Sequence, residues 1–179
     1  MGTKPRLLLL DAGAVFVCLR VDAWDAIVDA HEVVVPSIVV RVEVEFYVDQ
    51  RGERIEIDLA DDIARGRIRE VSMSVSGIEA VKKKFTPDFR DRLHDGELEG
   101  LAYLLANPGD DIRFVTGDGP AIEAVAMLDE DARVLSLAEA LDLCGRSKSL
   151  PHQFRREFVK RHLNEGMIRR IQGRGLSDV

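Results

Sequence analysis

Four consecutive leucines, Leu7 to Leu10, end abruptly at Asp11 and are followed by small residues. A run without a polar position cannot form a strand with one solvent-exposed face, so it predicts a strand buried on both faces, at the centre of a parallel sheet. Asp11 then lies at the carboxyl end of that strand. Ligands of open α/β sheets bind at this edge, and a carboxylate there is a hard oxygen ligand suited to Mg²⁺ or Mn²⁺. The simpler interpretation is that Asp11 caps the turn that follows.

Further apolar runs alternate with helical patterns along the chain. Strands are predicted at 33–35, 112–116 and 133–135, with weaker signals at 54–57 and 68–73. Helices are predicted at 58–65, 76–85, 87–94, from about Gly96 to Leu105, at 120–128, at 136–145 and after Pro151. Strands that alternate with helices are typical of a three-layer α/β/α sandwich with a central parallel sheet.

The segment from Ser37 to Phe46 carries two conflicting signals. Its β-branched residues and the alternation that begins at Val40 favour a strand. Ser37 is also a good helix cap, and Val39, Val42 and Phe46 have helical spacing. Local rules leave both structures open.

Acidic residues recur where strands end and helices begin. Asp118 follows the strand at 112–116 as Asp11 follows the first one, and Glu43 and Glu97 stand early in the segments after other strands or loops. Four acids that meet at one edge of a sheet would repel one another unless a divalent cation neutralised them. Such a cluster is typical of a metal-dependent phosphodiester hydrolase, because the metal activates water and stabilises charge on the phosphate.

The composition limits the class of protein. The chain has 179 residues, of which 46% are hydrophobic, enough for one core in one domain. No apolar run approaches the roughly 20 residues of a membrane helix, and the N-terminus lacks a signal-peptide layout, so we expect a cytoplasmic protein without membrane contact. Cys18 and Cys144 lack metal-type spacing and are expected to be buried thiols. The four histidines form no recognisable ligand or nucleophile motif.

The net charge of −7 is unevenly distributed. Residues 145–179 hold nine Lys and Arg against three acids, a net charge of +6, so the first 144 residues carry −13. We expect an α/β domain at 1–145 and a basic helical extension at 146–179 packed on the same domain. The extension could bind phosphates through Arg156, Lys160 and Arg161, or could present a solvated helix face.

Four short motifs occur in an order that is known from one protein family. They are Leu7 to Ala14 with Asp11, Val34-Val35-Pro36-Ser37 followed by Glu43, Gly96-Glu97-Leu98-Glu99 at the start of an Ala/Leu helix, and Val115-Thr116-Gly117-Asp118. Together they resemble the PIN domain family of ribonucleases, over roughly residues 6–136, with the segment at 50–90 as an insertion.

The resemblance implies an endoribonuclease that depends on Mg²⁺ or Mn²⁺, with RNA as its substrate. It implies that Ser37 begins a helix and that Asp11, Glu43, Glu97 and Asp118 hold one or two metal ions. Asp95 and Glu99 remain alternatives to Glu97 as the third acid. An antitoxin-like or other protein partner and a homodimer are further partners that the resemblance leaves open.

Two other functions remain open. A PIN-like module could bind RNA or a protein without cleaving it, because a fold does not guarantee its chemistry. Residues 7–13 also resemble the aspartate motif of haloacid dehalogenase-type phosphatases. That family needs a second Asp two residues after the first, and position 13 is Gly.

Overall fold

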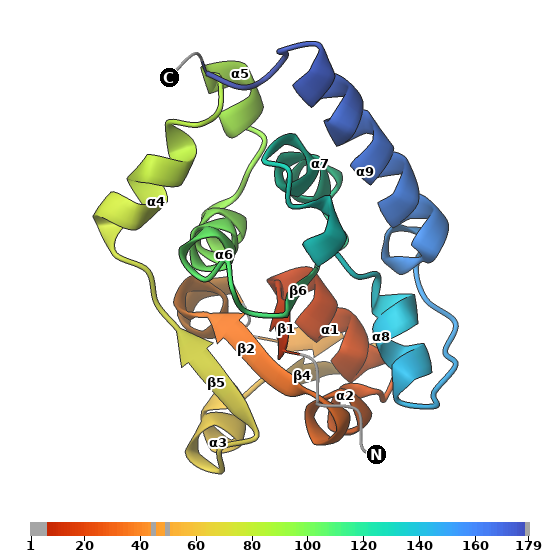
Figure 1. Ribbon diagram of the computed structural model, residues 1–179. Helices are drawn as coiled ribbons and strands as arrows, with labels where there is room; N and C mark the ends of the chain where they lie inside the picture. The colour runs from red at the N-terminus through yellow and green to blue at the C-terminus, as the bar shows by residue number, and fades with distance from the viewer. Residues whose placement is uncertain (1–6, 44–45, 49–50, 178–179) are drawn as a thin grey trace.

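The centre of the molecule is a parallel sheet of four strands, which we describe from a computed structural model covering residues 7–43, 46–48 and 51–177 (Figure 1). The strands are β1 (Leu7–Leu10), β2 (Glu32–Pro36), β5 (Ile68–Val71) and β6 (Ile112–Val115), in the spatial order β5-β2-β1-β6. β1 pairs with β2 on one side and with β6 on the other. The central position of the leucine run is therefore confirmed.

The side chains of β1 point alternately into two cores. Leu8 and Leu10 belong to one core and Leu9 to the other, and all three are fully buried. The first core includes residues of α1 (Ala12–Arg20), α2 (Trp24–Ala30), α3 (Leu59–Ala64) and α8 (Leu137–Leu143). The second includes residues of α4 (Val75–Lys82), α5 (Pro87–Arg90), α6 (Asp95–Ala106) and α7 (Gly119–Met127). Because helices cover both faces of the sheet, the predicted three-layer α/β/α sandwich is confirmed.

The ambiguous segment after β2 is helical. Ser37 and Ile38 form a helical turn that continues into η1 (Val39–Glu43), a short π-helix. The reason lies far away in the sequence: the Glu99 carboxylate accepts hydrogen bonds from the Ser37 hydroxyl at 2.8 Å and from the Ile38 N–H at 2.9 Å. Of the two structures that local rules left open for this segment, the helix is observed over 37–43, as the resemblance implies for Ser37; residues 44–45 lie outside the described residues, and Phe46 belongs to a strand.

One strand prediction is wrong, and the two weaker ones, at 54–57 and 68–73, are confirmed. Arg133–Leu135 is not a strand: it begins in the 3-10 helix η2 (Asp131–Arg133), and Val134 forms only an isolated bridge with Phe114. The fourth strand of the sheet is instead β5, which lies inside the segment expected to be an insertion. The hairpin of β3 (Phe46–Val48) and β4 (Arg54–Glu56) forms a separate antiparallel pair.

The C-terminal helix α9 (Arg156–Ile171) follows the short η3 (His152–Phe154) and packs along α7 (Figure 1). Beyond α9 the chain returns to the start of α5, where the Thr86 N–H donates to the Gly175 carbonyl at 2.9 Å. Among the residues that the structure describes, no helix combines the length and the apolar character needed to cross a membrane. Residues 1–6, 49–50 and 178–179 of the expected domains lie outside the described residues.

Candidate metal site at the carboxyl edge of the sheet

Three of the predicted acids line one cleft. Asp11 follows β1 and caps α1, Asp118 follows β6 and caps α7, and Glu97 lies in the first turn of α6. The cleft has a volume of about 510 Å³, and His94 lines it as well. Adjacent parallel strands end at the same edge, which is why Asp11 and Asp118 meet although they are far apart in the sequence.

Asp11 is held in place by its neighbours. One carboxylate oxygen accepts the Ala14 N–H at 2.6 Å, and the other accepts the hydroxyl of Thr116. The same Thr116 oxygen accepts the Asp118 N–H at 3.0 Å, so one hydroxyl links both acids. Burial raises the pKa of Asp11 to about 6, although the hydrogen bonds from Thr116 and Ala14 oppose this. Asp11 therefore caps its helix, as the simpler interpretation holds, and also lines the cleft.

Glu97 and His94 form a pair at the start of α6. The Glu97 carboxylate accepts the His94 N–H at 2.8 Å and lies 3.5 Å from His94 Nδ1. Burial is the main reason that the pKa of Glu97 rises to about 7, and the nearby charge of Asp118 raises it further. Burial also raises the pKa of Asp118 against the opposing effect of the Ala121 N–H. Burial is the main cause of all three shifts, and it favours the protonated form of each acid when no cation is bound.

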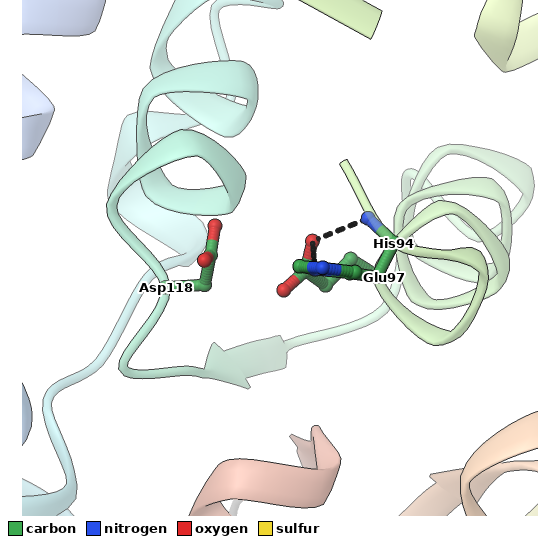
Figure 2. Close-up of side chains that lie close together, drawn as sticks. All are labelled: His94, Glu97 and Asp118. Carbon is green, nitrogen blue, oxygen red and sulfur yellow. Dashed lines mark hydrogen bonds and ion pairs between the residues drawn. The ribbon is translucent and has the colours of Figure 1, made fainter. Parts of the chain in front are cut away.

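His94, Glu97 and Asp118 lie close enough to share a cation. One ligand atom from each lies within 4.8 Å of the other two, and Figure 2 shows the Asp118 carboxylate facing the pair from α6. The sequence analysis was wrong to give no histidine a place in a ligand group. The signal that identifies His94 is its spacing from Glu97, because a glutamate at the third helical position bonds back to the residue that caps the helix.

Glu43 lies beside this group. Its carboxylate accepts the Gly96 N–H at 3.3 Å in the first turn of α6. A Cβ atom at position 96 would lie only 2.6 Å from a Glu43 oxygen, so a larger residue there would displace the end of the Glu43 side chain from this position. Glu43 lines a smaller cavity of about 280 Å³ that shares Asp11, His94 and Glu97 with the large cleft. The structure thus places all four predicted acids around two adjoining cavities.

The alternatives for the third acid lie elsewhere. Asp95 is exposed, whereas Glu99 is almost completely buried at 1% exposure. Besides its bonds to Ser37 and Ile38, the Glu99 carboxylate accepts the Met73 N–H at 3.0 Å. Glu99 therefore ties the starts of η1 and α4 to α6. Of the three candidates, only Glu97 reaches the cleft.

A second group of ligand atoms lies between α7 and α9, at Glu123, His162 and Glu165. Glu123 is already neutralised: it contacts Arg169 Nε at 3.0 Å, His162 Nδ1 at 2.9 Å and Arg92 at 3.4 Å. Two guanidinium groups at the same carboxylate disfavour a further cation there. The group at His94 is the better candidate for a metal.

The basic residues predicted to bind RNA do not converge. Arg156 pairs with Asp142 at 2.6 Å, and Arg161 pairs with Glu165 at 3.8 Å and lies over the Phe158 ring. Lys160 is exposed. These three residues line neither of the two cavities at the acids. Their role in RNA binding stays a prediction.

Comparisons of the chain with models of protein families, with curated proteins and with solved structures give no match. The similarity to the PIN domain family therefore stays a resemblance of short motifs.

Proposed function

We propose that the protein is a metal-dependent endoribonuclease of PIN type, which hydrolyses phosphodiester bonds of RNA at the cleft. The observation that carries this proposal is the convergence of His94, Glu97 and Asp118 beside the buried Asp11. These side chains come from the ends of two strands and the start of α6, and burial raises the pKa values of Asp11 and Glu97, as is common for acids at functional sites.

The donor set suits a divalent cation. Carboxylate oxygens are preferred by Mg²⁺ and Mn²⁺, and the imidazole nitrogen of His94 makes Mn²⁺ the better match of the two. Asp118 and Glu97 would hold the ion together with His94, and Asp11 and Glu43 would complete the acidic surroundings. When bound, such an ion lowers the pKa of a water molecule and stabilises negative charge on a phosphate.

The residues around the acids have their own roles. Thr116 fixes the Asp11 carboxylate and the backbone of Asp118 through one hydroxyl, so the two acids keep a constant separation. Phe16, Tyr47 and Phe154 line the same cleft. Bases of single-stranded RNA stack on aromatic rings, which favours RNA over a small phosphate ester as the substrate.

The phosphatase alternative fits the cleft less well. Gly13 occupies the position at which that chemistry needs a second acid, and an added Cβ there would lie 3.3 Å from the Phe154 ring and 3.6 Å from an Asp11 oxygen. The position is therefore closely packed against its neighbours. A module that only binds RNA or a protein would use the same residues of the cleft. The following experiment distinguishes it from a nuclease.

Cleavage of a single-stranded RNA should require Mn²⁺ or Mg²⁺, and Asp118→Asn should lower its rate by more than about 100-fold, because even residues that only support metal ligands cost up to that amount. Asp95→Asn is the matched control: it removes the same charge from an exposed position close to the cleft and should keep the activity. The rates are measured by gel electrophoresis of a labelled RNA.

Two results would contradict the proposal. If the wild-type protein does not cleave but Mn²⁺ raises its melting temperature, the cleft binds metal without hydrolysis and the binding module is correct. If Asp118→Asn and Asp95→Asn cleave equally well, the activity does not belong to this cleft.

A further inference from the structure

A basic cavity lies on the other side of Glu123, between α5, α9 and the residues that follow α9. It has a volume of about 290 Å³ and is lined by Thr86, Asp88, Phe89, Arg92, Arg169, Arg174 and Gly175. Three arginines from separate parts of the chain thus surround one small space. The sequence analysis singled out neither this space nor Arg92.

Two of these arginines are held in fixed positions. The guanidinium groups of Arg92 and Arg169 lie 5.1 and 5.7 Å from the centre of the Phe89 ring. Both contact the same oxygen of the buried Glu123, at 3.4 and 3.0 Å. An arginine has five N–H donors, so each retains donors that Glu123 does not use. The ring and the carboxylate together orient the two groups before any ligand arrives.

Arg174 is brought to the cavity by the end of the chain. The Gly175 carbonyl accepts the Thr86 N–H at 2.9 Å, and the Ser177 N–H donates to the Lys84 carbonyl at 2.9 Å. Gly175 has φ of +87°, a conformation that favours glycine. These bonds hold the chain beside α5, and Arg174 itself is exposed.

The charges around the cavity favour an anion. Glu123 offsets one of the three arginines, and the exposed Asp88 at the cavity offsets a second, so one positive charge remains together with several unused donors. The planar fork of a guanidinium matches the oxygens of a phosphate. A phosphate is therefore the ligand class that the cavity fits.

We propose that this cavity binds a backbone phosphate of the RNA at a distance from the bond that is cleaved. The proposal rests on the proposed function and narrows its substrate to a chain of several nucleotides. Glu123 lies five residues beyond Asp118 on α7, a rise of about 7.5 Å along the helix. The cavity and the cleft share no lining residue, so a phosphate in the cavity is not the one at the metal group, and an RNA of more than one nucleotide is needed to reach both.

Binding of a short single-stranded RNA is measured by fluorescence anisotropy at several salt concentrations, in EDTA so that no cleavage occurs. Arg174→Ala should weaken binding about threefold, the size of an exposed ion pair, and should make the salt dependence shallower by up to about 0.7 for the lost phosphate contact. Arg170→Ala is the matched control, because Arg170 lies only four residues before Arg174, in the last turn of α9, but pairs with Asp129 and does not line the cavity. Asp88→Asn should act in the opposite direction and tighten binding.

Equal effects of Arg174→Ala and Arg170→Ala would overturn the proposal, as would a failure of Asp88→Asn to tighten binding. Free phosphate is the other source of the same ligand. The assignment to RNA is wrong if inorganic phosphate raises the melting temperature of the wild type but not of Arg174→Ala, while Arg174→Ala binds RNA as the wild type does. Because the assay needs neither metal nor cleavage, a protein that proves inactive in the cleavage experiment still gives a clear result here.

Discussion

Asp11 and Glu97 are buried acids whose pKa values are raised by burial from the ordinary 3.8 and 4.5 to about 6 and about 7. Between about pH 4 and pH 7 the folded protein therefore holds protons that the unfolded chain has released. Their contribution favours the folded state at low pH and is lost as the pH rises through the folded-state pKa values. Without metal, these two acids should lower the free energy of unfolding most at neutral and alkaline pH.

Asp11→Asn tests this pH dependence. Asn keeps an oxygen that can accept the Ala14 N–H and removes the buried charge, so in EDTA the variant should be more stable than the wild type at pH 8, by at most about 3 kcal/mol. The gain should decrease at pH 5, where the folded wild type is mostly protonated. Thermal unfolding at the two pH values measures it. A gain of the same size at both would show that the charge of Asp11 is not its cause.

α7 is the element on which the functional residues depend, because it lies between α6 and α9. Its N-terminus carries Asp118 toward the cleft, and Glu123, further along, meets the arginines of the basic cavity. α9 approaches α7 so closely at Gly166 that an added Cβ would lie 2.5 Å from the Glu123 carbonyl oxygen. A backbone atom cannot turn away as the end of a long side chain can. The closeness of the two helices therefore requires glycine at this position.

Gly166→Ala should accordingly destabilise the protein. Alanine gains about 1 kcal/mol over glycine inside a helix, but forcing an extra atom into a packed contact costs about 1–3 kcal/mol, and contact with backbone places this case at the upper end. We expect a net loss of about 1–2 kcal/mol in the free energy of unfolding, measured by urea denaturation. Gly109→Ala is the control, because no atom lies within 4 Å of a Cβ at that position. Equal stability of the two variants would mean that α9 does not pack on α7 as described.

The basic C-terminal segment is packed into the core of the folded molecule. Leu150, Phe154 and Val159 are buried, and the first two belong to the core that contains Leu8 and Leu10. α9 also neutralises Glu123, which would otherwise be a buried charge with fewer partners. We therefore expect the fold of the domain to depend on this segment.

A chain that ends at residue 145 should therefore lose cooperative thermal unfolding, because it exposes α7 and removes part of the first core. A chain that ends at Gln172 retains α9 but loses the backbone bonds of Gly175 and Ser177 and the packing of Leu176 on the second core, so it should unfold cooperatively at a lower temperature than the complete chain. Circular dichroism during heating follows both. Cooperative unfolding of the shorter chain at the temperature of the complete chain would show that residues 1–145 fold independently.

The sequence alone determined the features that depend on neighbouring residues. Leu7 to Leu10 specify a strand buried on both faces because every position is apolar, and the alternation of strands with helices specifies the three layers. Asp11 and Asp118 could be placed at one edge because each directly follows a strand of a parallel sheet. These inferences need only the period of apolar residues and the direction of the strands.

Only the tertiary structure decided the features that depend on distant residues. Ser37 to Glu43 became helical because Glu99, more than fifty residues later, satisfies the first backbone groups of that turn. His94 became a candidate ligand because α7 brings Asp118 to it, and Arg92 meets Arg169 because both contact Glu123. A hydrogen bond or an ion pair acts over a few ångströms in space, whatever the separation along the chain. The period of apolar residues along the chain therefore does not indicate such a contact.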